Sequence, residues 1–173
     1  LTDPSKTPYN LFAATDYSTN ARATLVAWFD TRWKNHPDNG KRKPRFACSY
    51  MFASPYCSAP IKAIKDMATI LGFEIGPDQD VSLFAIDTKS QVLALKDFKP
   101  DVVWHGNTTM SVASTLRDAY SLGLGADHII NNWGIDENLP KLAGEAANGA
   151  ASSTFDSDEY HFSFTYPASW ILQ

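Results

Sequence analysis

The chain has 173 residues, of which 44% are hydrophobic and 20% charged, and its formal net charge is −4. This balance supports a packed core and excludes disordered, collagen-like and low-complexity chains. The negative charge argues against a nucleic-acid surface, and no apolar run reaches the roughly 20 residues that cross a bilayer as a helix.

The first half of the chain predicts helices and short strands in alternation. Asp16 or Ser18 can cap a first helix, because its side-chain oxygen accepts a hydrogen bond from a free N–H group of the first turn. Ser58 opens a second helix, which has Pro60 in its first turn and ends at Gly72. In chain order the expected elements are an extended start at Tyr9–Phe12, the first helix with its apolar stripe, a solvated loop over residues 36–44, a strand at Phe46–Phe52, the second helix, a strand at Phe73–Ile75, a turn at Gly76–Asp80 and an extended apolar run at Val81–Ile86.

The second half continues the same alternation. Asp87 can cap a third helix, which stops at Lys99 because the residue before a proline is disfavoured in the helical region. Thr108 or Thr109 opens a fourth helix, with one hydroxyl as its cap, and Gly123 ends it. The other expected elements are a strand at Asp101–His105, a strand at His128–Ile130, a short helix at Leu139–Ala147 and an extended segment at Ala150–Phe155.

Strands that alternate with helices of this length predict an α/β fold with right-handed crossovers. We expect a three-layer sandwich around a central parallel sheet of about five strands, with flavodoxin-like or Rossmann-like topology. In such sheets, ligands bind beyond the carboxyl ends of the strands. The loops at those ends are residues 53–58, 85–88, 106–109 and 131–136, so a functional site is expected there.

The common catalytic and metal-binding motifs are missing from the sequence. It has no dinucleotide-binding glycine motif after a strand, no P-loop, no H-E-x-x-H, no C-x-x-C and no G-x-S-x-G. Its four histidines lack the spacing of metal ligands, and Cys48 is expected to be a small core residue. We therefore predict no catalytic residue, no metal and no cofactor. An α/β enzyme remains an alternative, and it would need His105 and Asp87 as an ionisable pair at the strand ends.

Hydroxyl, amide and aromatic side chains occupy the predicted strand-end loops. Such groups orient and bury a small molecule but do not readily move protons at neutral pH. Two of them have a structural alternative, since a threonine hydroxyl can cap the helix and Trp133 can be a partly buried anchor. The candidate ligand-binding residues are Tyr17, Ser54, Tyr56, Asn107, Thr108, Thr109 and Trp133.

Three segments of the chain, in the same order, resemble type I periplasmic binding proteins. Residues 87–103 resemble that family's Asp-led helix that ends in Lys-Pro-Asp before a buried strand. Arg117–Gly123 is similar to Arg-x-Ala-x-x-Leu-Gly, and Leu142–Gly149 is similar to the Ala-Gly-x-Ala-Ala-x-Gly signature. The resemblance covers residues 8–155 and is closest to the branched-chain amino-acid (Leu/Ile/Val) binding proteins of ABC importers.

This resemblance implies two α/β lobes joined by a hinge, with the ligand between them, and the chain is similar to the second lobe only. It implies binding of a small carboxylate such as an amino acid, a missing N-terminal lobe, the membrane subunits of an ABC importer as partners, and an extracytoplasmic location. Residues 1–15 are then a lead-in, 16–155 the ligand-binding lobe and 156–173 an apolar tail. Because the sequence starts at Leu1 without a signal-peptide pattern, we expect a processed protein or part of a longer one.

The resemblance also implies roles for individual residues. Tyr56 matches an aromatic ligand contact, Thr108 and Thr109 match a tyrosine pair, and Trp133 lies near an acidic residue that pairs with a ligand ammonium group. Because an indole does not satisfy an ammonium as a carboxylate does, we expect a flatter or aromatic carboxylate in place of a plain α-amino acid. An alternative from another class is a ligand-sensing lobe of a receptor or regulator with the same fold.

Overall fold

The computed structural model describes residues 5–6, 15–152, 155–157 and 162–164. Its centre is a five-stranded sheet in the order β2-β1-β4-β5, with β3 also paired to β1. All of these pairs are parallel, which confirms the predicted α/β class and strand number. The strands are β1 (Arg45–Tyr50), β2 (Glu74–Ile75), β3 (Gln79–Asp80), β4 (Val102–His105) and β5 (Asp127–Ile130).

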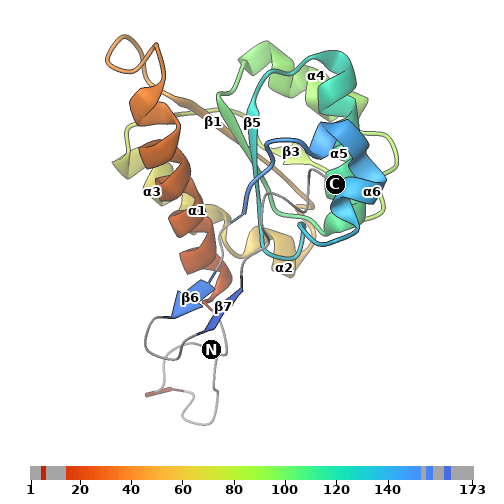
Figure 1. The fold of residues 1–173 in the computed structure, drawn as a ribbon, viewed down its shortest axis with the longest axis horizontal. Helices are drawn as coiled ribbons and strands as arrows, with labels where there is room; N and C mark the ends of the chain where they lie inside the picture. Colours follow the sequence, from red (N-terminus) through yellow and green to blue (C-terminus); the bar gives the residue numbers. More distant parts are fainter. Residues whose placement is uncertain (1–4, 7–14, 153–154, 158–161, 165–173) are drawn as a thin grey trace.

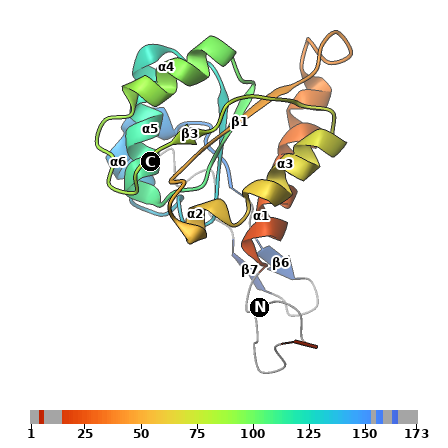
Figure 2. The same cartoon turned by 180° about the vertical axis from the view of Figure 1, so that it is seen from behind.

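Helices cover both faces of the sheet, so the predicted three layers are present (Figures 1 and 2). α1 and α3 pack together on one face, and α4, α5 and α6 lie on the other. The helices are α1 (Tyr17–Thr31), α2 (Pro55–Ser58), α3 (Ile61–Ile70), α4 (Lys89–Phe98), α5 (Thr109–Leu122) and α6 (Leu139–Ala143), with 3-10 turns η1 (Trp33–Asn35) and η2 (Gly144–Ala147).

Alternation along β1 sends its side chains to the two helical layers in turn. Phe46 and Cys48 belong to the cluster that contains buried residues of α1 and α3, whereas Ala47 belongs to the cluster with Val92 of α4. Trp104 of β4 is buried in the first cluster. Each large side chain buried in this way stabilises the fold by about 1.5–3 kcal/mol.

The start of α1 follows the predicted capping pattern. The Asp16 carboxylate accepts hydrogen bonds from the backbone N–H groups of Ser18 and Thr19, at 2.9 and 3.0 Å. Two of the four N–H groups that a helix start leaves unpaired are thereby satisfied. Asp16, and not Ser18, is therefore the cap of this helix.

Two predicted helix starts are wrong. Ser58 does not open the second helix, because the chain first forms the separate short helix α2, capped by Ser54 and favoured by Pro55 in its first turn. α3 then begins at Ile61, directly after Pro60. In α4, Thr88 and not Asp87 is the N-cap residue, although the Asp87 carboxylate still accepts from the Lys89 N–H at 3.0 Å.

The segment between α3 and α4 also differs from the prediction. The expected turn at Gly76–Asp80 contains β3, which pairs with the carboxyl-terminal half of β1. The expected extended run at Val81–Ile86 is a loop without strand pairing. Val81 is buried, but Phe84 and Ile86 are 84% and 86% exposed. Apolar composition predicted an extended segment here, but residues 81–86 pair with no strand of the sheet that the structure describes.

The remaining predictions concern the cysteines and the chain ends. Cys48 is a free, buried core residue as predicted, and Cys57 is also free. Within the expected extended segment Ala150–Phe155, Ala151 bridges Ile129 in parallel. β6 (Phe155–Ser157) and β7 (Phe162–Phe164) form an antiparallel pair near the start of α1 (Figure 1). The predicted start at Tyr9–Phe12 and most of the predicted tail lie outside the described residues.

Candidate ligand-binding site

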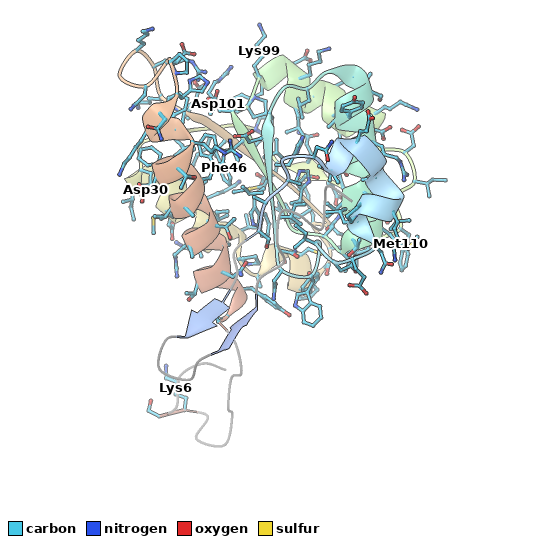
Figure 3. All side chains as sticks on the ribbon, viewed as in Figure 1. Lys6, Asp30, Phe46, Lys99, Asp101 and Met110 are labelled. Carbon is cyan, nitrogen blue, oxygen red and sulfur yellow. The ribbon has the colours of Figure 1, made fainter. Side chains whose placement is uncertain are left out.

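The loops that follow β1, β3, β4 and β5 meet at one end of the sheet, which we call the carboxyl edge (residues 51–54, 81–88, 106–109 and 131–136). Figure 3 shows Met110, just after the β4 loop, at the end of the molecule opposite to Lys99, just before β4. The parallel pairing of the strands is the reason, since it places all carboxyl ends on the same side. The predicted position of the site at these loops therefore corresponds to a real edge of the fold.

Asn107 ties three of these loops together. Its side chain is 2% exposed. Its Oδ1 accepts from the Met51 N–H after β1, and its Nδ2 donates to the Val81 carbonyl after β3, both at 2.9 Å. Both groups of this predicted ligand-binding amide are thus used within the chain, and they hold the edge in one shape.

Tyr56 and Tyr17 form an aromatic pair beside the carboxyl edge. Their rings are 5.4 Å apart in an edge-on arrangement, so α2 contacts the first turn of α1. The Tyr56 hydroxyl donates to Asn131 Oδ1 at 3.3 Å. Burial raises the pKa of Tyr56, and the bond to Asn131 only partly opposes that effect. The phenol therefore stays neutral and keeps its proton for this hydrogen bond.

The two threonines differ in what they contact. Thr108 is the N-cap residue of α5, but its side chain makes no capping hydrogen bond, and the buried Thr109 hydroxyl donates to Asp136 Oδ2 at 2.9 Å. The prediction that one of these hydroxyls caps α5 is therefore wrong, because Asp136 provides a carboxylate partner for Thr109. Ser54, another candidate, caps α2 through a 3.4 Å bond from the Cys57 N–H.

Trp133 presents its indole at the surface of the carboxyl edge. The residue is 58% exposed, although its backbone N–H is held by Asn131 Oδ1 at 2.8 Å. Other large apolar side chains are exposed here as well, namely Phe52 and Phe84 in the loops and Met110 in the first turn of α5. Exposed apolar side chains that gather at one edge are typical of a surface that binds a ligand or another protein.

Sequence reasoning missed Asn131, whose side chain organises the loop after β5. Its Oδ1 accepts from the N–H groups of Trp133 and Gly134, both at 2.8 Å, and from Tyr56. Gly134 packs so closely that a Cβ atom there would lie 2.7 Å from the Asn107 carbonyl oxygen. An Asn directly after a buried strand and three residues before a Gly is the pattern that marks this turn in the sequence.

The ionisable pair required by an enzyme does not form. His105 is buried, and its Nε2 lies 2.9 Å from His128 Nδ1. Burial, with a smaller effect of His128, lowers the pKa of His105, so the ring is neutral at pH 7. Asp87 is exposed and binds Lys89, and its pKa is lowered by hydrogen bonds from that residue. Each group has its own partner, and neither acts on the other.

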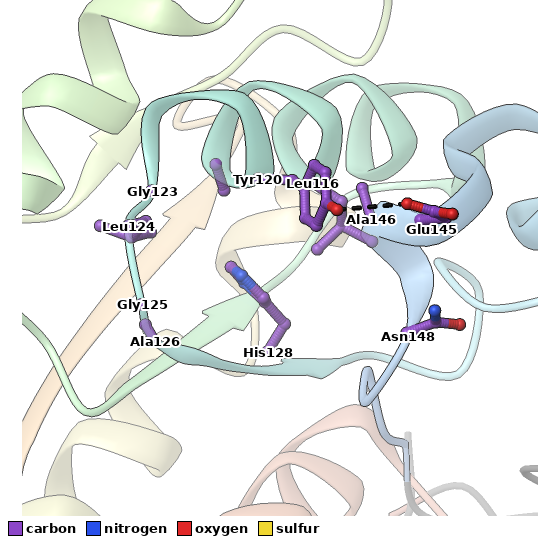
Figure 4. A pocket seen from close by; sticks show the side chains of 11 residues that line it. Leu116, Tyr120, Gly123, Leu124, Gly125, Ala126, His128, Glu145, Ala146 and Asn148 are labelled. Carbon is purple, nitrogen blue, oxygen red and sulfur yellow. Dashed lines mark hydrogen bonds between the residues drawn. The ribbon is translucent and has the colours of Figure 1, made fainter.

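A cavity of about 450 Å³ lies away from the carboxyl edge, between the end of α5 and η2 (Figure 4). His128 forms part of its lining, and the Tyr120 hydroxyl donates to Glu145 at 3.2 Å across it. None of the predicted site residues lines this cavity.

Among the described residues, no group of three or more His, Cys, Asp or Glu side chains is placed to hold a metal ion. None of the helices in that part of the chain is long and apolar enough to span a membrane.

Comparison with known proteins gives consistent matches. A family model described as "Periplasmic binding protein" matches residues 1–161. A substrate-binding protein of an ABC transporter from Aeropyrum pernix has a similar structure, with 30% identity, a TM-score of 0.67, and coverage of 83% of this chain and 36% of that protein. A branched-chain amino-acid ABC transporter protein from Thermus thermophilus, solved with bound valine, has 27% identity and a TM-score of 0.74 over 91% of this chain and 39% of that protein.

A leucine-binding protein from Thermotoga maritima shares the fold alone, with 17% identity and a TM-score of 0.65 over 78% of this chain and 35% of that protein. A search of curated protein sequences gives no match. The chain therefore spans between a third and two fifths of the length of these solved relatives.

Proposed function

The chain belongs to the periplasmic binding protein family, and we propose on this basis that it forms one lobe of the solute receptor of an ABC importer. Its family and its structural relatives are substrate-binding proteins, so its role is solute binding and not catalysis. We propose an extracytoplasmic location, with the membrane subunits of the importer as partners.

The carboxyl edge carries this proposal. It combines loops fixed by Asn107 and Asn131 with the exposed face of Trp133 and the paired rings of Tyr56 and Tyr17. Rigid polar positions beside apolar surface are what a small-molecule site requires. In a parallel sheet this edge is also the usual place for a ligand.

A second lobe completes the proposed site. The chain spans less than two fifths of the length of its solved relatives, and the carboxyl edge is a single wall. A site that buries most of a small molecule needs walls on several sides. The remaining wall is assigned to an N-terminal lobe, and the solute lies in the cleft between the two.

The proposed solute is a small carboxylate, either an amino acid of the branched-chain class or an aromatic acid. The Thermus thermophilus relative was solved with valine, which favours the first. The exposed Trp133 indole favours a flat apolar group, and α5 begins at the same edge, where the Thr108 side chain makes no capping hydrogen bond. The positive end of that helix dipole is directed toward this edge and favours a negative group there. We therefore prefer the aromatic acid.

Isothermal titration of the two-lobe parent protein tests the proposal, with leucine and benzoate as probes. Trp133→Ala is expected to weaken benzoate binding at least tenfold, because the indole face is lost. Tyr120→Ala is the matched control, since Tyr120 is an exposed aromatic residue outside the carboxyl edge. Tight leucine binding that Trp133→Ala does not change would refute the aromatic-acid preference. Absence of binding to any small carboxylate would refute the ligand class.

A ligand-sensing lobe of a receptor or regulator is the second candidate, because the same fold serves it. The open cleft wall is equally suited to that role. Co-purification of the parent protein with importer membrane subunits favours the transport function, and stable attachment to a DNA-binding or signalling domain favours the sensor.

A further inference from the structure

We propose that Asn131 is a specificity-determining residue that donates a hydrogen bond from its side-chain NH2 group to an oxygen of the solute. This inference deepens the proposed function and rests on it. The sequence pattern marks Asn131 only as a turn residue, and the proposed role follows from how its two polar ends are used.

The carbonyl end of Asn131 is fully engaged. Oδ1 accepts from the N–H of Trp133 and the N–H of Gly134 at 2.8 Å, and from the Tyr56 hydroxyl at 3.3 Å. A backbone N–H can only donate, so the atom that faces these two groups must be the oxygen. The orientation of the carboxamide is thereby determined, and its NH2 group points away from the turn that Oδ1 holds.

The NH2 end of Asn131 is free and accessible. No described residue accepts a hydrogen bond from Nδ2. In the described part of the chain, the buried side-chain atoms without a partner are Arg45 Nε, Asp78 Oδ1, Trp104 Nε1, Asn132 Oδ1 and Ser152 Oγ. Because Nδ2 is unpartnered and is not one of these, it has surface in contact with solvent. The residue as a whole is only 7% exposed, so the donor sits in a narrow opening.

The position of this donor defines the chemistry that it recognises. Asn131 Oδ1 accepts from the Tyr56 hydroxyl and from the backbone N–H of Trp133, so the residue lies where the loop after β5 meets α2, at the carboxyl edge. The side chain has no remaining acceptor for an ammonium group, whereas two N–H bonds are available for an oxygen. It therefore selects a solute that presents a carboxylate or carbonyl oxygen to this edge.

The substitution Asn131→Asp separates the proposed donation from the NH2 group to the solute from the role of Oδ1 in holding the turn. The carboxylate can still accept the three hydrogen bonds that hold the turn, but it replaces the donor with a negative oxygen. In the two-lobe parent protein we expect an unchanged melting temperature and at least 100-fold weaker binding of benzoate by titration calorimetry. Asn138→Asp adds the same charge at an exposed residue after the loop and is expected to bind benzoate like the wild type.

The other outcomes are equally decisive. Equal benzoate affinity of wild type and Asn131→Asp, with Asn138→Asp also unchanged, would overturn the donor role and leave the proposed function intact. If the wild type binds benzamide but neither benzoate nor leucine, the carboxylate class is wrong. The donor role is then supported by weakened benzamide binding in Asn131→Asp and overturned by equal binding. A wild type that binds none of the three probes contradicts both proposals.

Discussion

The two ends of the sheet are held together by different interactions. At the carboxyl edge, the neutral amides of Asn107 and Asn131 bond to the backbone of the loops. The carboxylates of Asp80 and Asp118 also accept from backbone N–H groups there, those of Phe52 and Thr88. We call the opposite end the amino edge (residues 36–45, 72–74 and 99–101). There, charged side chains hold the loops together. Arg42 binds Asp101 through two 2.7 Å hydrogen bonds, and Arg45 lies over the Phe98 ring.

This difference is informative about function. The two amides fix their loops without adding a charge that would attract or repel an ionic solute. The amide network also leaves the Trp133 indole and one NH2 group available at the surface. The amino edge has no such free aromatic face, because its Trp33 is buried beneath Arg42.

The largest expected effect comes from breaking the amide network. Asn107→Leu removes both bonds and leaves the Met51 N–H and the Val81 carbonyl without partners. At about 1–3 kcal/mol for each buried group left unsatisfied, the free energy of unfolding should fall by about 3 kcal/mol in urea titrations. Asn39→Leu, which changes an exposed asparagine of the amino edge, should cost under about 1 kcal/mol. Equal losses in the two variants would contradict the comparison.

Acid should first destabilise the sheet itself, through the His105–His128 pair that joins β4 to β5. Burial lowers the pKa of His128 to about 4 and also lowers that of His105. The unfolded chain then binds more protons than the folded one below pH 6.5, so stability falls as the pH drops from 6.5 towards 4. For His128 alone the loss is about 2 kcal/mol at pH 5.

Urea unfolding at pH 7.5 and pH 5.0 measures this loss. His128→Gln should show a smaller drop between the two pH values than the wild type, since one of the two groups no longer titrates. His36→Gln removes an exposed histidine of the amino edge and should behave like the wild type. A drop that is identical in all three proteins would show that the buried pair is not its source.

Asp101 should make the amino edge sensitive to acid only at lower pH. Partial burial disfavours its charge, but hydrogen bonds from Arg42 and from the Arg45 N–H outweigh this and lower the pKa of Asp101 below 3.8. Its contribution is therefore complete above pH 3.8 and is lost as the pH falls further. Asp101→Asn should cost about 1–2 kcal/mol at pH 7, and the difference between variant and wild type in the free energy of unfolding should shrink as the pH falls below 3.8. A difference that does not shrink with falling pH would count against the ion pair.

The smallest expected effect is a gain of stability at the amino edge. Lys99 ends α4 with φ 56°, a left-handed conformation that strains a residue with a side chain. Lys99→Gly should raise the free energy of unfolding by about 0.5–1 kcal/mol in urea titrations. Lys96→Gly, inside the same helix, should lower it by about 1 kcal/mol. A loss in both variants would mean that Lys99 makes contacts that outweigh its strain.

Local patterns in the sequence were sufficient for the main elements of the fold. The strands at β1, β4 and β5 were predicted within a few residues, because each is a short apolar run with turn residues on both sides. The prediction failed at Val81–Ile86, where the composition is equally apolar. Burial of such a run depends on a neighbouring strand, and the order of strands in the sheet is a property of the whole fold.

The gathering of the candidate loops at one edge of the sheet was predicted, but the contacts of their side chains were not. Parallel topology follows from the alternation of strands and helices, so the loops that carry Tyr56, Thr108 and Trp133 could be assigned to one edge. Asn131 could not be assigned, because its role depends on a hydrogen bond from Tyr56, which is distant in the sequence. The two hydrogen bonds of the Asn107 side chain could not be predicted either, because they depend on where Met51 and Val81 lie in the folded chain.

The sequence by itself determined the α/β class, the edge at which the strand-end loops gather and the absence of the common catalytic motifs. These depend on periodicity, turn chemistry and residue type, all of which act over short distances along the chain. Only the tertiary structure decided which polar groups remain available at the surface. Hydrogen bonds between loops occupy some donors and acceptors and leave others exposed. That selection is why Asn107 stabilises the carboxyl edge while the NH2 group of Asn131 is left for the proposed solute.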